Sequence, residues 1–466
     1  METEFSLNSR WLLPARRSHV VRRALAVATL VAALLIVPGV RGWIARAVPG
    51  PATGEYRYPF QRATRGAVIR DLQAEIGFYQ DRIRRDPTGG LDPASLAGAY
   101  LRMARATGDL SWYLLAEQAA RRSLANLPYH NTGAILVLAR IAEARHDFPE
   151  ALRLAAEVAG KEEALAIQVT SYLAMGALDE AAGAADQLLP LAPTLGAYTL
   201  RGLVQEARGR DEEALADFHR ALALEEPGEA GGSAAVRAYL GRLHYRRGRL
   251  DQARTLYREA LRILPQHPLT LINLAELELR QGRYADAERH LAEVVTITEA
   301  SPNVFDHAVL RGLARAKALA GDASGAEALW DEAERRLRRD VTDGTFGHRR
   351  ELARLLLERG RSPDAKEALA LMRNEVKIRR DAETLDILAW ALTRAGRWGE
   401  ARAAMREALA RGIRDAGMLY RAGLIEQALG HTEATARFFS AVLSADPGYD
   451  QNARRVAGLG LWEGER

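Results

Sequence analysis

The chain has 466 residues, 48% of them hydrophobic, a formal net charge of +5 at neutral pH and no cysteine. The lack of cysteine excludes disulfides, thiolate metal sites and cysteine nucleophiles. Residues 1–60 hold eight arginines and three glutamates, so the entire net charge lies there and the rest of the chain is balanced. A balanced body gives DNA or RNA binding little electrostatic support.

The N-terminal region begins with a basic segment, residues 1–23, and continues with an uncharged apolar stretch, residues 24–40. Seventeen helical residues span about 26 Å, slightly less than the ~30 Å hydrocarbon core of a membrane. The long side chains of Arg22, Arg23 and Arg41 can reach the interfaces and close that gap. The pattern therefore predicts a transmembrane helix.

The arginines flanking this helix predict its orientation. Five precede it and three follow it by residue 57, which favours a cytoplasmic N-terminus and an extracytoplasmic body. Cleavage as a secretory signal is the alternative, because A-R-A at 45–47 has the small-x-small form. Arg41, Trp43 and Arg46 would be unusual before a cleavage site, so an uncleaved anchor is favoured.

Residues 41–64 are predicted to be a linker, since 49–60 contain three prolines and two glycines. Residues 65–92 follow as an N-terminal capping helix that is apolar on one side and ends near Asp86-Pro87. The main array is expected over 93–447, with a C-terminal cap and tail at 448–466. Glycine-containing loops are expected at Glu225–Ser233 and Arg339–Gly347.

The array is predicted from a recurring pattern that is clearest at 248–265, G-R-L-D-Q-A-R-T-L-Y-R-E-A-L-R-I-L-P. Gly248 precedes a small residue, Ala253, by five positions, and the ring of Tyr257 comes four residues later. Small residues allow two helices to approach closely and the ring fills the space beside them. This spacing predicts one helix of a two-helix unit.

The same spacing recurs every 33 to 39 residues, and a second small residue lies twelve positions before each small residue of the pattern. The repeated pairs are Gly176/Ala181, Gly209/Ala214, Gly282/Ala287, Gly321/Ala326, Gly360/Ala365, Gly396/Ala401 and Gly430/Thr435. Two positions depart from the pattern: His146 stands where glycine is expected, and Val169 replaces the small residue of the first helix.

These motifs resemble the tetratricopeptide repeat family over about residues 65–455, best at 211–222, 248–261 and 390–402. The resemblance implies an all-α, right-handed superhelical solenoid of about ten hairpins whose first helices line the concave face. The whole chain is also similar to bacterial proteins of this family with one N-terminal hydrophobic segment, a group that implies no single activity.

Catalytic signatures are absent from the sequence: there is no phosphate-binding loop, no G-x-S-x-G and no H-E-x-x-H. The ten histidines are scattered singly. We therefore expect no enzyme activity, no cofactor and no metal.

A recognition surface remains, and the family geometry places it on the first helices. Arginines with interleaved aromatic side chains suit a protein or peptide partner that is acidic or carries carboxylates. The residues expected in this concave groove are Arg242, Tyr245, Arg246, Asn273, Glu276, Arg280, Arg311, Arg315, Arg350, Arg354, Trp390, Arg394 and Tyr420.

The functional hypothesis is a membrane-anchored scaffold that mediates protein–protein interactions in assembly or regulation of a cell-envelope complex. The alternatives are a secreted or periplasmic soluble adaptor after signal cleavage, and an accessory subunit of a polysaccharide or cytochrome assembly system. The absence of cysteine disfavours relatives in lipopolysaccharide control that carry a cysteine-ligated metal module.

Overall fold

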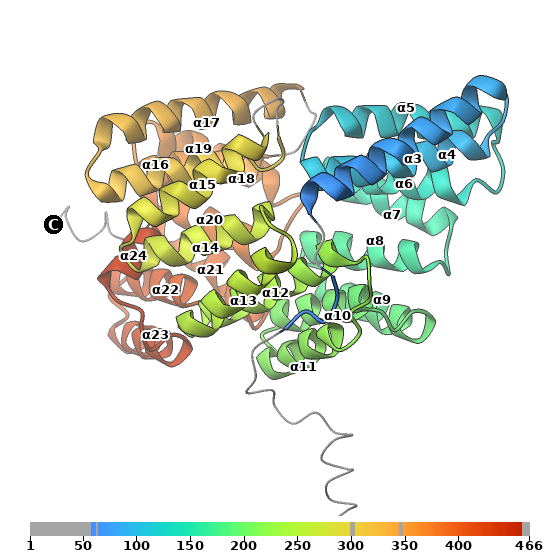
Figure 1. The fold of residues 1–466 in the computed structure, drawn as a ribbon. Coiled ribbons are helices and arrows are strands. Elements are labelled where there is room, and N and C mark those ends of the chain that lie inside the picture. Colours follow the sequence, from blue (N-terminus) through green and yellow to red (C-terminus); the bar gives the residue numbers. More distant parts are fainter. Residues whose placement is uncertain (1–56, 62–63, 299–302, 344–347, 459–466) are drawn as a thin grey trace, which may run out of the picture. The chain divides into compact units, whose positions relative to one another are not determined.

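The computed structural model describes residues 57–61, 64–298, 303–343 and 348–458, all of which belong to the unit Arg57–Arg466. These residues form 22 helices and no sheet (Figure 1). None of the described helices is long and apolar enough to cross a bilayer. The predicted transmembrane helix at 24–40 lies outside the described residues.

Twenty of the helices form ten consecutive hairpins, each made of a first (A) helix and a second (B) helix that pack together. Hairpins 1–5 are α4(Leu91–Thr107)/α5(Ser111–Asn126), α6(Thr132–Ala144)/α7(Phe148–Glu157), α8(Glu162–Met175)/α9(Leu178–Leu191), α10(Leu195–Ala207)/α11(Asp211–Leu222) and α12(Ala230–Arg246)/α13(Leu250–Ile263). Hairpins 6–10 are α14(Pro268–Arg280)/α15(Tyr284–Thr298), α16(Asp306–Ala320)/α17(Ala323–Asp343), α18(Arg349–Arg359)/α19(Asp364–Glu375), α20(Ala382–Arg394)/α21(Trp398–Ala410) and α22(Ala416–Ala428)/α23(Thr432–Ala445). The single helices α3(Arg65–Arg85) and α24(Gln451–Val456) precede and follow them.

Both predicted glycine-containing loops are shorter than expected. Helix α12 begins at Ala230, so Gly231 and Gly232 of the predicted loop Glu225–Ser233 lie in its first turn, and only Gly228 stays outside the helix. Helix α17 continues to Asp343, through the first half of the loop predicted at Arg339–Gly347. The prediction gave these glycines too much weight, because packing of a helix against its neighbours overrides a weak local preference.

Close helix crossings hold each hairpin together. In hairpins 4 and 5 an A-helix glycine faces a buried B-helix ring: a β-carbon at Gly202 would lie 2.8 Å from the Phe218 ring, and one at Gly241 would lie 2.5 Å from the Tyr257 ring. The predicted pairing of a small A-helix residue with a large B-helix side chain is thus confirmed at these two crossings. The A-helix backbone packs directly against the ring, with no room for a β-carbon.

Hairpin 3, where the sequence departs from the pattern, reverses the sizes. Val169 on the A helix is fully buried and packs in one cluster with Ala181 and Ala185 of the B helix. Ala185 occupies the position that carries a ring in hairpins 4 and 5. In hairpin 3 the larger residue is therefore on the A helix and the smaller one on the B helix, and together they fill the crossing.

Exchanging the sizes at one crossing tests this complementarity. We expect Gly241→Ala to destabilise the protein by about 1–3 kcal/mol, because the new methyl group overlaps the Tyr257 ring. Adding Tyr257→Leu should cost much less than Tyr257→Leu costs alone, since Ala275 faces Leu291 in hairpin 6. Urea unfolding of the three variants measures the coupling. Additive effects of the two changes would contradict this account.

The turn between the A and B helices needs a left-handed residue, which glycine supplies in most hairpins. His146 takes this place in hairpin 2 with φ +61°. Its ring stacks on Phe148 at 5.7 Å and meets the edge of His348, also at 5.7 Å. The contact with His348, which precedes hairpin 8, accounts for a bulky residue at a strained position.

Hairpin 2 is one of several early hairpins that contact hairpins much later in the chain. The loop before hairpin 7 docks on the turn of hairpin 1, where the Val304 amide donates to the Gly108 carbonyl at 3.0 Å and the Asn303 side chain donates to the Thr107 carbonyl at 2.8 Å. The Arg380 amide, before hairpin 9, donates to the Met175 carbonyl of hairpin 3 at 3.1 Å. These donors satisfy carbonyls at the ends of A helices.

The same arrangement continues to the end of the array. Gly412, before hairpin 10, touches Gly209 in the turn of hairpin 4, and Asp446, after hairpin 10, touches Gly248 in the turn of hairpin 5. Helix α24 packs against α14 (Figure 1). Asn452 donates to two carbonyls at the end of α14. Each A–B turn of hairpins 1–5 thus meets the loop that precedes the hairpin position six further on. We call this row of contacts the seam.

The seam divides the turn glycines into two groups. A β-carbon at the turn glycine of hairpin 1, 3, 4 or 5 would overlap atoms of the later loop. Nothing among the described residues lies within 4 Å of such an atom at Gly282, Gly321, Gly396 or Gly430, in the turns of hairpins 6, 7, 9 and 10. The array therefore closes on itself after six hairpins and leaves the turn glycines of hairpins 6, 7, 9 and 10 uncovered within the part described.

Two equivalent turn glycines separate the cost of the turn from the cost of the seam. Gly282→Ala should destabilise the protein by about 1–2 kcal/mol, because its φ of +72° disfavours a β-carbon. Gly209→Ala has nearly the same φ, +71°, but should cost about 1–3 kcal/mol more, because its methyl group overlaps the Gly412 carbonyl. Urea midpoints provide the comparison, and equal losses would contradict a packed seam.

Candidate functional site

Ion pairs link successive A helices along the inner side of the array. Arg246 of α12 pairs with Glu206 of α10 at 2.9 Å, and Arg315 of α16 pairs with Glu276 of α14 at 2.5 Å. Arg421 of α22 reaches Asp386 of α20 at 2.8 Å. Each arginine therefore meets a carboxylate of the preceding A helix.

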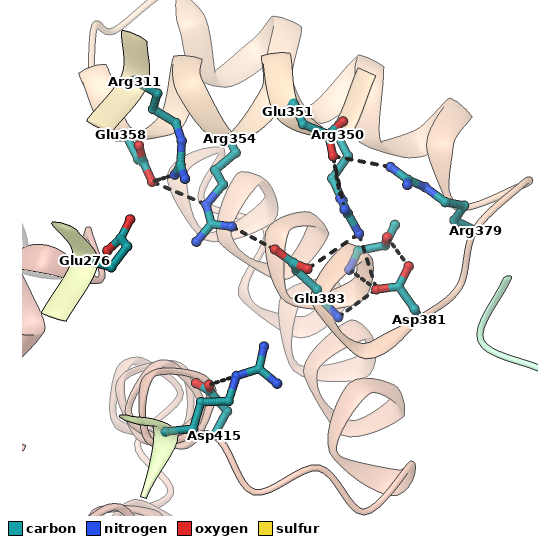
Figure 2. Close-up of polar contacts among 12 residues, drawn as sticks. Glu276, Arg311, Arg350, Glu351, Arg354, Glu358, Arg379, Asp381, Glu383 and Asp415 are labelled. Atoms are coloured by element: carbon teal, nitrogen blue, oxygen red, sulfur yellow. Dashed lines mark hydrogen bonds and ion pairs between the residues drawn. The ribbon is translucent and has the colours of Figure 1, made fainter. Parts of the chain in front are cut away.

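We call this series of ion pairs between A helices the ladder. Its ion pairs across α16, α18 and α20 are shown in Figure 2. Glu358 accepts from Arg311 at 2.7 Å and from Arg354 at 3.3 Å, and Arg354 continues to Glu383 at 2.7 Å. Arg350 lies beside Glu383 at 3.6 Å. Arg354 and Glu383 thus form the centre of a chain of charges that crosses three helices.

Arg350 also holds the neighbouring carboxylates. It contacts Glu351 at 3.0 Å and Asp381 at 3.5 Å (Figure 2). Arg379, which is buried, bonds to Glu375 at 2.6 Å and lies 3.6 Å from Glu351. The carboxylate of Asp381 also caps the N-terminus of α20, accepting from two backbone amides. The loop before α20 therefore serves both the seam and the ladder.

A pocket of about 190 Å³ opens among these groups. Its lining residues are His307, Ala308, Arg311, Arg350, Glu351, Arg354 and Glu383. Three arginines and two carboxylates converge there, although protein surrounds the site. The side chains of Arg354 and Glu383 still expose 36% and 42% of their surface. The interior is thus enclosed but open to water.

The charges set the protonation states in the pocket. Arg350 lowers the pKa of Glu383 to about 2, and Arg354 adds to the effect. Burial alone would raise the pKa of Glu358, but Arg311, Arg315 and Arg354 together lower it. Burial lowers the pKa of His307 to about 3, with the nearby His348 contributing. At neutral pH the carboxylates are ionised and His307 is neutral.

Among the described residues, no group of three or more histidine, aspartate or glutamate side chains is arranged to hold a metal ion. The three histidines at the seam, His146, His307 and His348, contact one another through their rings. The chemistry that the interior offers is ionic recognition and hydrogen bonding.

Protein-family models match three segments of the sequence that forms these hairpins. Models described as tetratricopeptide repeat match residues 193–266, 247–305 and 382–414. The chain belongs to the tetratricopeptide repeat family.

A solved structure described as a tetratricopeptide repeat protein from Parabacteroides merdae ATCC 43184 is 18% identical to this chain. The match covers 64% of this chain and 98% of that one, with a TM-score of 0.29. The comparison with curated proteins finds no match.

Most of the arginines predicted to line the groove of the tetratricopeptide repeats take part in the ladder. Arg246, Arg311, Arg315, Arg350 and Arg354 all bond there to carboxylates of the chain. Glu276, also predicted, is the partner of Arg315. Arg242 is half-buried, lies 3.5 Å from Glu206 and stacks over Tyr239 at 5.5 Å. The prediction that these residues contact a partner stays a prediction.

Other predicted residues hold the tetratricopeptide array together. Arg280 is buried and bonds to Asp446 at 2.6 Å across the seam, with its guanidinium over the Tyr245 ring at 5.4 Å. Trp390 is only 3% exposed, and Arg421 lies 4.5 Å above its ring. Such buried side chains cannot present themselves to a partner without a change in the fold.

The remaining three predicted residues are half-buried. Tyr420 packs against Phe439 at 5.2 Å and lies under Arg454 at 4.7 Å. Arg394 donates to the Gly360 carbonyl at 3.1 Å. The Nδ2 atom of Asn273 is buried without a hydrogen-bond partner among the described residues, so this amide has a buried donor that is not used there.

The sequence prediction missed the carboxylates. Glu206, Glu358 and Glu383 neutralise the groove arginines, yet only arginine and aromatic positions were selected, apart from Glu276 and Asn273. A signal exists for two of them, because Glu358 and Glu383 lie on the same A helices as selected arginines, whereas Glu206 lies on α10, where no residue was selected. Their partners come from neighbouring hairpins, which a search within one repeat does not compare.

Proposed function

We propose that this tetratricopeptide repeat protein is a membrane-anchored scaffold that binds protein partners during assembly or regulation of a cell-envelope complex. The observation that carries the binding proposal is the water-accessible pocket on the A helices, where Arg311, Arg350 and Arg354 converge. The repeat family supports protein–protein interaction as the general role. The described residues offer ionic recognition there.

The chemistry of the partner can be inferred from the carboxylate that neutralises the arginines of the pocket. Glu383 lies between Arg350 and Arg354 and is the most exposed carboxylate in that group. A guanidinium binds any carboxylate in the same two-pronged geometry. We infer that Glu383 acts as an internal substitute for a partner's carboxylate, which would displace it on binding. An acidic or carboxylate-bearing peptide fits this exchange.

A matched set of variants tests the exchange by crosslinking and co-purification of the full chain from detergent-solubilised membranes. Glu383→Gln should raise recovery of the specific partner several-fold, because two arginines lose their internal carboxylate. Arg354→Gln should reduce recovery. The control, Arg289→Gln with Arg335→Gln, changes exposed arginines outside the ladder and should leave recovery unchanged.

Circular dichroism of each variant separates loss of binding from loss of fold. If a partner is recovered equally from Glu383→Gln, Arg354→Gln and wild type, the interior pocket is not its binding site. If no partner above background is recovered from any of them, the scaffold proposal itself fails.

The anchoring proposal rests on the apolar stretch 24–40 and its arginine flanks. Protease added to intact spheroplasts should cut the repeats but not residues 1–23, and the full-length chain should stay in the membrane fraction. Uncut repeats would contradict the orientation. A mature chain beginning near residue 48 would instead support the cleaved, soluble adaptor.

A further inference from the structure

We propose that the seam continues between molecules, so that the uncovered turns of one copy dock on the uncovered loops of a second copy. This interface lies outside the interior pocket and does not depend on the proposed function. Two surfaces of the described chain carry the inference. The turn edge comprises the A–B turns of hairpins 6, 7 and 9, at Gly282, Gly321 and Gly396, and the loop edge comprises the loops before hairpins 1–4.

The two edges are complementary because the seam already joins their counterparts. Within one chain, turns of hairpins 1–5 receive loops from six hairpins further on, and in hairpins 1 and 3 these loops donate to helix-end carbonyls. Every hairpin repeats the same unit, so the later turns offer carbonyls in the same orientation. A second copy can therefore extend an interface that already exists.

Within the described part of the chain, exposed large apolar side chains occur at the uncovered loops and not in the loops that the seam covers. In the loops that the seam covers, Asn303, His348, Arg379 and Asp446 are buried polar residues. At the loop edge the exposed fractions are 69% for Leu91, 78% for Tyr129 and 58% for Leu191, three of the seven large exposed apolar residues among those described. Exposed apolar side chains beside an unsatisfied edge favour a protein interface.

The loop edge ends with the loop before hairpin 4, because an N-terminal segment approaches hairpin 5. The backbone amide of Tyr58 donates to Glu259 of hairpin 5 at 2.9 Å. The loops before hairpins 2, 3 and 4 have no such cover among the described residues. Tyr129 and Leu191 lie in or beside two of them.

The single helices set the register. Helix α24 follows hairpin 10 in the place of an A helix, and α3 precedes hairpin 1 in the place of a B helix. If α24 of one copy pairs with α3 of the next, they complete an eleventh hairpin. The six-hairpin step then places Tyr129 of the second copy at the Gly321 turn and Leu191 at the Gly396 turn.

The contact is head-to-tail, because different edges meet, so it leaves one free edge at each end. Such heterologous association builds open chains instead of closed dimers. We expect the mean mass of the full chain in detergent to rise continuously with protein concentration, as measured by light scattering, without a plateau at two copies.

Charged substitutions at the loop edge test the surface. Tyr129→Glu with Leu191→Glu should weaken association about tenfold or more, because both carboxylates would have to lose water at the interface. The matched control, Leu114→Glu with Leu115→Glu, changes residues that are 51% and 37% exposed on α5 and should associate like wild type. A chain that stays monomeric at every concentration, or one whose association ignores the edge variant, would overturn the proposal.

Disulfide capture tests the register, since the chain has no cysteine of its own. A Leu191→Cys chain mixed with an Arg397→Cys chain should form a crosslinked pair, because Arg397 follows Gly396 in the turn. A mixture with Arg361→Cys, one hairpin away in the turn of hairpin 8, should crosslink at least about tenfold more slowly because the sulfurs lie out of reach. Equal crosslinking in both mixtures would refute the register, and preferential Arg361 crosslinking would shift it by one hairpin.

Discussion

The structure depends on backbone carbonyls at the ends of A helices and on donors that arrive from six hairpins later. A helix leaves its last carbonyls without internal partners, and in an isolated hairpin water satisfies them. Here the Asn303 side chain, the Arg380 amide and the Asn452 side chain supply three of these bonds. A solenoid ordinarily gains stability only from neighbouring repeats. The seam adds long-range contacts, which tie early and late hairpins into one unit.

Closure of the seam also creates the interior environment. Because the array returns on itself, the A helices of hairpins 7–9 enclose a polar pocket. Charges in such a space need partners, since burial without them is costly. The ladder from Glu206 to Arg421 provides them, and it explains why arginines there do not form a simple cationic groove.

The sequence predicted what depends on spacing within one repeat. The crossing of Gly241 with Tyr257 follows from residues sixteen apart, so the all-helical hairpin array could be derived from it. The partnership of Arg354 with Glu383, and that of Gly209 with Gly412, join different hairpins. Such contacts depend on how many hairpins make one winding, which no local pattern specifies. The groove positions were therefore identified without the carboxylates that occupy them.

The six-hairpin step limits how the number of repeats can change. Repeat arrays commonly gain or lose a whole unit, because each unit contacts only its neighbours. In this chain, removing one hairpin between the two sides of the seam would pair His146 with the loop beside Arg380 in place of His348. Every other seam contact would shift with it. Repeat number here behaves like the register of a strand in a closed barrel, where a single slip mismatches the whole row.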